Sequence, residues 1–298
     1  MWDDAVAAKF RPWEESARRD FEKAVETGAE EGREYFQALL AFVRERMQEC
    51  VDLCKKSLDK NPAQEEVCKL LGDALHFGTG IIGAELSPEQ RRNLEAAAGA
   101  YTRAIELRAN YYEARIMRAN EYHTLEDPDR MRADIESALA QRPGDPLGCW
   151  MMGQYYGRSN DAEKALLWYE KGLRSKPDSF ANLVNHAVQL SQVGRFDDAA
   201  AEVERALKAN PAHYFPWYLR GSIRSKNKDM DGAIADLEKS TRLSPTFSSS
   251  WYNLGALYYN SKRWLDARGA FDRALQLGHA KRDEIEQILR QIDAKLGD

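Results

Sequence analysis

The segment Trp251–Leu277, with the sequence WYNLGALYYNSKRWLDARGAFDRALQL, contains the pattern that decides the fold. Large apolar side chains and small ones occur in it at fixed offsets. The large side chains fill the space between neighbouring helix hairpins, and the small ones let two helices approach each other closely. The positions concerned are Trp251, Leu254, Gly255, Tyr258, Ala267, Phe271 and Ala274.

The same pattern recurs upstream with a period of 34 residues. Four prolines mark the period, because proline cannot continue a helix and falls at the turn into the next unit. A repeat of this kind indicates a stack of helix hairpins, none of which can bury its apolar face alone. The prolines are Pro143, Pro177, Pro211 and Pro245.

These residues resemble the tetratricopeptide repeat family, whose motif places Trp, Leu-Gly, Tyr, Ala, Phe, Ala and Pro at fixed offsets in a unit of this length. The resemblance is strong over 112–281 and extends more weakly to 31, giving about seven units. It implies an all-α fold, a right-handed alpha-solenoid of antiparallel helix hairpins in a TPR-like superhelix. The strongly matching units start at Tyr112, Pro146, Phe180, Tyr214 and Ser248.

Two further units fit upstream, starting near 31 and near 65, although Glu34 stands where the first should have a large apolar residue. The distance from Pro62 to Pro143 exceeds two units by 13 residues, which predicts an insertion loop at about 77–90. Within it, Ser87-Pro88-Glu89-Gln90 has the residues of a helix N-terminus with a capping box.

The flanks of the repeat region are also predicted to be helical. Residues 1–30 have the pattern of an N-terminal helical extension interrupted at Pro12. Residues 282–298 have the pattern of a polar-faced capping helix, which a stack of hairpins needs because its last pair would otherwise expose a core face. No alternating strand pattern is present.

The composition argues against a nucleic-acid or membrane-inserting protein. The 298 residues carry a formal net charge of −5, whereas binders of nucleic acids and anionic membranes usually show a basic surface. No apolar run approaches the length of a membrane span, and the acidic N-terminal residues lack a secretory signal pattern. Four Cys without a disulfide framework favour a reducing compartment, so we expect a cytoplasmic location.

One glycine-rich segment could suggest nucleotide binding. Gly78-Thr-Gly80-Ile-Ile-Gly83 matches the glycine pattern of dinucleotide sites, but a helix precedes it where such a site needs a strand. A loop is the favoured interpretation. The apolar Ile81 and Ile82 are then candidate loop contacts, either with the solenoid or with a partner.

Metal and catalytic sites are not favoured. Cys50, Cys54 and Cys68 could face one another across two helices, but they lack a C-x-x-C spacing and suit buried core positions. His76 and His123 occupy equivalent repeat positions, where they more often line a groove than bind metal. No catalytic motif is present. We therefore expect no enzyme activity, no cofactor and no metal.

Four arginines stand at positions that the repeat usually keeps apolar. A buried guanidinium is costly unless it is paired. Either the aliphatic stems pack while the charged ends reach solvent, which is the favoured reading, or the arginines form an anion-binding pocket. They are Arg115, Arg118, Arg220 and Arg224.

The resemblance also implies a binding surface, because in the family one face of each first helix lines a concave groove. The equivalent residues here are rich in aromatic side chains and poor in charge. They depart from the family's carboxylate clamp, since Met117 replaces its Asn, and Leu70 and Leu219 break the family's asparagine ladder. The candidate partner-binding residues are Tyr35, Lys69, Asp73, His76, Ile116, Asn120, His123, Trp150, Gln154, Val184, Asn185, Phe215, Tyr218, Tyr252 and Tyr259.

We therefore predict an adaptor or scaffold that binds a peptide or helix of a partner protein in this groove, as a monomer or weak homo-oligomer. Trp150, Tyr218 and Tyr252 are the expected hot spots, and Asn120, Gln154 and Asn185 would bond to a partner backbone. Two alternatives stay open. One is a homo-oligomeric scaffold formed through the 77–90 loop or the end units, and the other is a regulatory subunit or repeat part of a larger enzyme complex.

Overall fold

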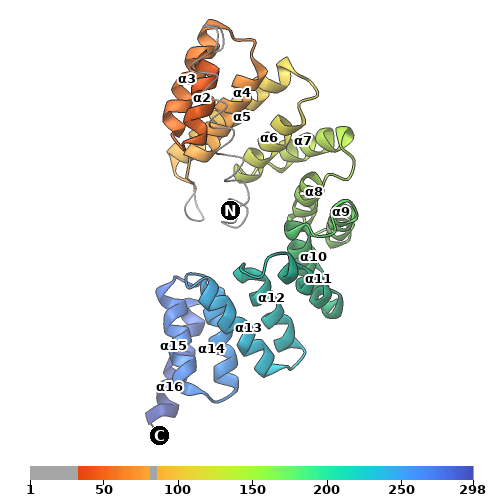
Figure 1. The fold of residues 1–298 in the computed structure, drawn as a ribbon. Helices are drawn as coiled ribbons and strands as arrows, with labels where there is room; N and C mark the ends of the chain where they lie inside the picture. Colours follow the sequence, from red (N-terminus) through yellow and green to blue (C-terminus); the bar gives the residue numbers. More distant parts are fainter. Residues whose placement is uncertain (1–32, 81–85, 298) are drawn as a thin grey trace. The chain divides into compact units, whose positions relative to one another are not determined.

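A computed structural model describes residues 33–80 and 86–297 of the chain, and these residues form an all-α fold. The described part contains 15 helices, connected by short turns (Figure 1). The helices up to residue 158 are α2 (Arg33–Val43), α3 (Met47–Lys60), α4 (Glu65–Gly78), α5 (Pro88–Leu107), α6 (Tyr112–Thr124), α7 (Pro128–Gln141) and α8 (Pro146–Arg158). They continue as α9 (Ala162–Ser175), α10 (Phe180–Gln192), α11 (Phe196–Ala209), α12 (Tyr214–Lys226), α13 (Met230–Leu243), α14 (Ser248–Asn260), α15 (Trp264–Gln276) and α16 (Arg282–Gly297).

Successive helices form hairpins, and we call the two helices of each hairpin its first and its second helix. The first helices α6, α8, α10, α12 and α14 are each 13 residues long. They begin at the residues where the 34-residue spacing starts its units. Before α8, α10, α12 and α14 a proline in the turn prevents the preceding helix from continuing, whereas the turn before α6 has none.

The turn between first and second helix has the same backbone conformation in six hairpins. One residue there adopts a positive φ, and the following N–H donates to a carbonyl five residues earlier, for example from Arg263 to Tyr258 at 2.9 Å. This is the Schellman arrangement that closes a helix C-terminus. The residues with positive φ are Glu45, Glu126, Asn160, Gly194, Lys228 and Lys262.

The insertion lengthens a helix as well as a loop. Helix α5 has 20 residues, whereas the second helix α7 has 14. It begins at the predicted place: the Ser87 side chain accepts from the Gln90 N–H, and the Gln90 side chain accepts from the Ser87 N–H. The described residues resume at 86, so Ile81 and Ile82 lie outside them.

Helices within a hairpin approach closely where a small residue faces an aromatic one. An added Cβ at Gly153 would lie 2.3 Å from the ring of Tyr169, which itself is 2 % exposed. Glycine at this position is therefore required by the packing, since a methyl group would displace the ring.

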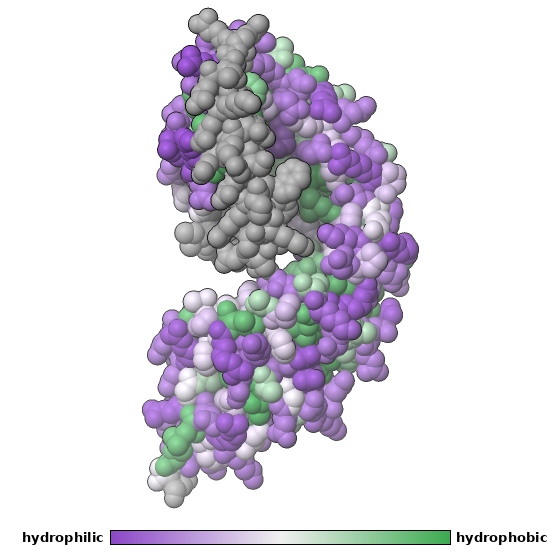
Figure 2. Space-filling view, in the orientation of Figure 1, coloured by the Kyte–Doolittle hydropathy of each residue, from purple (hydrophilic) through white to green (hydrophobic). Residues whose placement is uncertain are grey.

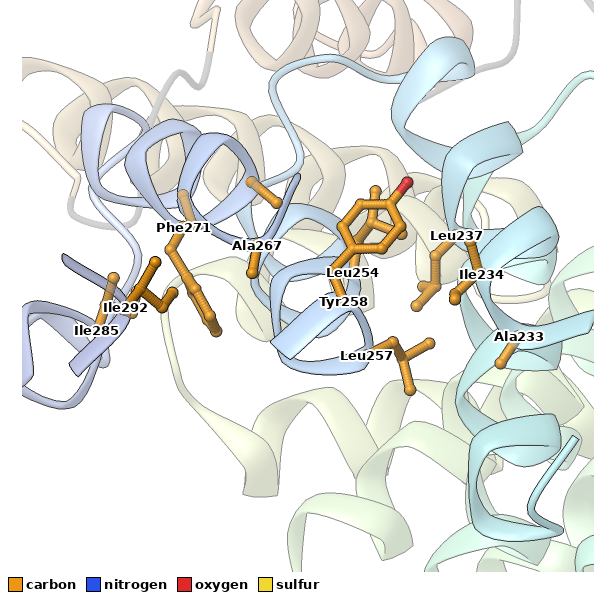
Figure 3. Close-up of a cluster of buried hydrophobic side chains, with 12 residues drawn as sticks. Ala233, Ile234, Leu237, Leu254, Leu257, Tyr258, Ala267, Phe271, Ile285 and Ile292 are labelled. Carbon is orange, nitrogen blue, oxygen red and sulfur yellow. The ribbon is translucent and has the colours of Figure 1, made fainter. Parts of the chain in front are cut away.

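The last hairpins of the second unit share an apolar core (Figure 3). Leu254 and Tyr258 of α14 lie between Leu237 of α13 and Ala267 of α15. On the other side, Ile285 and Ile292 of α16 are fully buried against the same cluster. Helix α16 therefore covers the apolar face that the last hairpin would otherwise expose.

The chain divides into two compact units, Met1–Gly148 and Cys149–Asp298. The division falls inside α8, where the sequence shows no change of repeat pattern. Hydrophilic residues cover most of the visible surface of the described residues, with hydrophobic ones in smaller areas (Figure 2). Among the described helices, none is long and apolar enough to cross a membrane.

Candidate functional site

In the second unit, the predicted groove residues of α12 belong to a cluster of aromatic rings. The rings of Phe215 and Tyr218 are 5.6 Å apart between centroids, and both meet Phe247, at 6.1 and 5.1 Å. Tyr214 joins from the start of α12 at 4.9 Å from Phe247. All four rings are half-buried, so they are held in fixed orientations and still present surface. We call these four residues the aromatic cluster.

Ser222, one turn after Tyr218 on α12, is small and uncharged. Ser222 donates its hydroxyl to the Tyr218 carbonyl at 2.9 Å, so its side chain lies along its own helix. It also accepts a hydrogen bond from Asn253 of α14 at 3.3 Å. The surface beside the rings is therefore polar without carrying a charge.

Two of the side-chain amides that we expected to bond to a partner backbone, those of Gln154 and Asn185, are hydrogen-bonded to each other. Gln154 Nε2 donates to Asn185 Oδ1 at 3.0 Å, and Asn185 Nδ2 donates to the Ala181 carbonyl at 2.8 Å. These groups link successive first helices of the second unit. Trp150 is half-buried, while Val184 is only 9 % exposed and presents little surface.

Side chains of helix α16 accept hydrogen bonds from the hydroxyls of Tyr252 and Tyr259, the last two predicted groove residues. Tyr252 donates to Glu284 at 2.5 Å and accepts from Lys281 at 3.0 Å, and its ring stacks on His279 at 4.6 Å. Tyr259 donates to Gln291 at 2.8 Å. Both tyrosines therefore serve in part to hold the capping helix, a role that sequence reasoning did not assign to them.

In the first unit, two predicted groove residues, Lys69 and Asp73, belong to a polar network. Lys69 pairs with Asp73 along α4 at 2.5 Å, and Tyr101 of α5 donates its hydroxyl to the other Asp73 oxygen at 2.8 Å. Burial, followed by the Asp73 carboxylate, raises the pKa of Tyr101 well above its ordinary value. Asp73 itself is 7 % exposed, so it acts mainly inside the unit.

His76 faces a carboxylate that the sequence analysis missed. Its Nδ1 lies 2.8 Å from Glu121 of α6, whose side chain is fully buried. Burial raises the pKa of Glu121. Burial alone would lower the pKa of His76, but the hydrogen bond and charge of Glu121 outweigh it and raise that pKa. The pair joins the first helices of two successive hairpins.

The remaining predicted residues of the first unit differ in accessibility. Ile116 is 4 % exposed and belongs to the interior. Tyr35 packs against the apolar cluster of α2, α3 and α4, and Asn120 and His123 are half-buried. Burial raises the pKa of Tyr35. No single aromatic surface like that of the second unit is assembled from these residues.

Two of the unusual arginines bind buried aspartates within their own hairpins, so the expectation that their charged ends reach solvent was wrong for these two. Arg118 binds both oxygens of Asp134, at 2.6 and 2.7 Å, and Arg220 binds both oxygens of Asp236, at 2.7 and 2.8 Å. In each pair the residues are 16 apart. The aspartates were not singled out from the sequence, although the equal spacing in two repeats is a signal that could have identified them.

A third hairpin places a histidine at the arginine's position. His186 Nδ1 lies 3.7 Å from Glu202 and Nε2 lies 3.9 Å from Glu170, so carboxylates face the buried ring. Both ring nitrogens of His186 are buried without a hydrogen bond.

The cysteines lie in the core. Cys50, Cys54, Cys68 and Cys149 are free thiols and all are buried. Across residues 33–80 and 86–297, no group of His, Cys, Asp and Glu side chains is arranged to hold a metal ion. The neighbouring Cys50, followed by burial, raises the pKa of the Cys54 thiol, which suits a core side chain rather than a reactive one.

Comparison with known proteins places this architecture. Models of the tetratricopeptide repeat match residues 148–179, 185–246 and 248–278. No curated protein matches the sequence. A tetratricopeptide repeat protein from Parabacteroides merdae is similar in structure, with 17% identity, a TM-score of 0.63 and coverage of 92% of this chain and 99% of that one.

Two other solved structures share the fold. In the APC/C hetero-tetramer Cut9-Hcn1, the similar chain has 15% identity and a TM-score of 0.62; the match covers 92% of this chain but 59% of that one. Yeast Tom70 has 13% identity and a TM-score of 0.62, with coverage of 99% of this chain and 76% of that one. Residues within 148–278 are therefore tetratricopeptide repeats, and the described residues as a whole have the fold of solved tetratricopeptide repeat proteins.

Proposed function

We propose that the second unit binds an extended or helical segment of a partner protein at the aromatic cluster, and that the protein acts as an adaptor without chemistry of its own. Proteins of this family generally mediate protein–protein interactions. Similar chains occur in a hetero-tetramer, which accords with such a role. The buried free thiols favour a reducing compartment, so we place this role in the cytoplasm.

The aromatic cluster is the observation that carries the proposal. Its rings are fixed by contacts with one another, so a partner can bury them at low cost in side-chain entropy. Their surroundings are neutral, which favours a partner segment with apolar anchors rather than a charged one. Of the predicted hot spots, Tyr218 belongs to this cluster, whereas Tyr252 is partly engaged by α16.

The test is an affinity capture with mass spectrometry that compares the wild type with Phe215→Ala/Tyr218→Ala and with Trp150→Ala. A matched control is Leu167→Ala on α9, a side chain that is 61 % exposed and is not a predicted groove residue. Circular dichroism should first show equal helicity for all variants. We expect a discrete set of proteins to be lost with the groove variants and retained with the control.

The proposal fails if the groove variants recover the same proteins as the wild type. Recovery of only the bait itself, with a mass in light scattering that rises with concentration, would instead favour the homo-oligomeric scaffold.

A further inference from the structure

An open hollow of about 340 Å³ lies in the second unit among α13, α14 and α15. Its apolar wall includes Trp251, Leu254 and Leu265, and Glu238 stands at its rim. None of the predicted groove residues lines it. The hollow is therefore a separate surface from the one proposed above.

In the preceding repeat, the position equivalent to this hollow is occupied by the side chain of Arg220. There the guanidinium of Arg220 lies over the ring of Trp217, 4.7 Å from its centroid. It also donates to Glu204 at 2.7 Å, and binds Asp236 as described above. An aromatic face and two carboxylates thus enclose an arginine that comes from the chain itself.

The last repeat retains part of this receiving site and lacks the arginine. Trp251 and Glu238 stand one 34-residue period after Trp217 and Glu204. At the positions of Arg220 and Asp236, however, the chain has Leu254 and Ala270. The two tryptophans are also held alike: each indole N–H donates to a proline carbonyl, Pro211 at 2.9 Å and Pro245 at 3.0 Å.

Helix α15 departs from the other second helices on the face that borders the hollow. The equivalents of Leu265 in the four preceding repeats are all acidic, namely Asp129, Glu163, Asp197 and Asp231. Leu265 is a large apolar side chain at the rim, and it is 72 % exposed. One turn later, a Cβ added at Gly269 would meet no atom within 4 Å, so the missing side chain leaves the hollow open.

The charge at the rim suits a cation. Glu238 Oε1 accepts from the Tyr258 hydroxyl at 2.7 Å, while Oε2 is 3.6 Å from Arg242, beyond hydrogen-bond distance. Asp266 also lines the hollow, on α15, but it is paired with Arg263 at 2.7 Å. The Glu238 carboxylate is therefore the lining acceptor that a bound cation would meet.

We propose that this hollow binds an arginine side chain of a partner protein, with the guanidinium against Trp251 and Glu238 and the alkyl stem along Leu254 and Leu265. The bound group would reproduce the contacts that Arg220 makes one repeat earlier. This site is independent of the aromatic cluster.

The probe is the capped peptide acetyl-Ala-Ala-Arg-Ala-Ala-amide, titrated into the full ¹⁵N-labelled chain. The readout is the indole N–H resonance of Trp251, assigned by its loss in Trp251→Phe. We expect a saturable shift with the arginine peptide. The citrulline peptide, which has the same shape without the charge, should bind at least about fivefold more weakly, because the cation supplies the attraction to ring and carboxylate.

Two variants test the location. Gly269→Leu should fill the hollow, and Glu238→Gln should remove the carboxylate, and each should weaken binding at least about fivefold. The matched control is Gly99→Leu on α5, where an added Cβ likewise meets no atom within 4 Å. That variant and Phe215→Ala/Tyr218→Ala should bind the peptide as the wild type does.

The proposal is overturned if the Trp251 resonance does not shift, if citrulline binds equally well, or if Gly269→Leu leaves binding unchanged while the variant remains as helical as the wild type. Tighter binding of free arginine than of the capped peptide would also overturn it, because the ligand would then be the amino acid rather than a protein segment.

Discussion

At the scale of single residues, two successive repeats join the helices of a hairpin by different interactions at equivalent positions. Arg220 and Asp236 join the helices of one hairpin by a paired charge, and their side chains are 15 % and 4 % exposed. Leu254 and Ala270 occupy the same positions one repeat later and are both 3 % exposed. Because burying two charges costs hydration that their attraction only partly returns, the ionic and apolar solutions should be similar in stability.

A double variant tests this equivalence. Asp236→Ala alone leaves the Arg220 guanidinium partly buried beside one exposed carboxylate, and should lower the free energy of unfolding by about 3–5 kcal/mol. Arg220→Leu/Asp236→Ala installs the residues of the last repeat at these two positions and should recover most of that loss. Arg224, which also donates to Asp236 at 2.9 Å, is 36 % exposed and keeps Asp229 at 3.6 Å. Urea unfolding followed by circular dichroism measures both. A double variant as unstable as the single one would show that the ion pair contributes net stability.

The His76–Glu121 pair makes a prediction about pH. Both pKa values are raised in the folded chain, so the folded state holds these protons more tightly than the unfolded state. Stability from His76 is then full below its unfolded pKa of about 6.5 and is lost as pH rises through the higher folded value. The first unit should therefore be more stable near pH 6 than near pH 8, as urea unfolding at the two pH values would show.

Proton NMR titration of the histidine ring signals checks this directly. His76 should titrate above the ordinary histidine value, and Glu121→Gln should lower its pKa, because burial then acts without the carboxylate. His279 serves as an internal control, since burial and Lys281 lower its pKa. A His76 signal that titrates at or below that of His279 would contradict the pairing.

At the scale of helices, caps and turns fix where each element begins and ends. The capping box of Ser87 and Gln90 satisfies two backbone N–H donors at the start of α5, just after the insertion. Helix α5 follows a longer connection than the other second helices do, so no tight turn fixes its first residue. The cap fixes the start of the helix instead.

Ser87→Ala should therefore lower the free energy of unfolding by about 1 kcal/mol, through the loss of the N-cap bond. Hydrogen exchange should also become faster at the first turn of α5. Ser261→Ala, at the end of α14, is the matched control and should change neither quantity. Equal effects of the two substitutions would mean that the cap does not hold the start of α5.

The sequence predicted the helices better than it predicted the site. The 34-residue spacing places the first helices, because proline and small residues act locally on the backbone. The partners of His76 and Tyr252 escaped prediction, since Glu121 and Glu284 reach them from other helices across a packed interface. Such contacts depend on side-chain direction between neighbouring helices, which the spacing alone does not determine.

At the scale of the whole molecule, each compact unit is a linear array in which a hairpin contacts mainly its neighbours. In the second unit, Ile285 and Ile292 of α16 close one end of the array and are fully buried. A stack of this kind transmits a local loss of stability along the chain with decreasing effect.

Ile285→Ala should cost about 2–5 kcal/mol locally, because it leaves a cavity in the terminal core. Hydrogen exchange measured by mass spectrometry should speed up most in α15 and α14 and least in α10 and α11. Leu296→Ala on the same helix, where the side chain is 39 % exposed, should leave the exchange pattern unchanged. A uniform increase through the unit would indicate all-or-none unfolding instead.

The recurrent turn between first and second helices has a consequence for engineering. One left-handed backbone position is filled in turn by glutamate, asparagine, glycine and lysine, with φ between 57° and 80°. Only glycine avoids the clash between side chain and backbone, which costs other residues about 1 kcal/mol. The six turns therefore allow different side chains to be compared in the same backbone conformation within one protein. Glycine placed at Lys228 or Lys262 would raise thermal tolerance without altering either proposed binding surface.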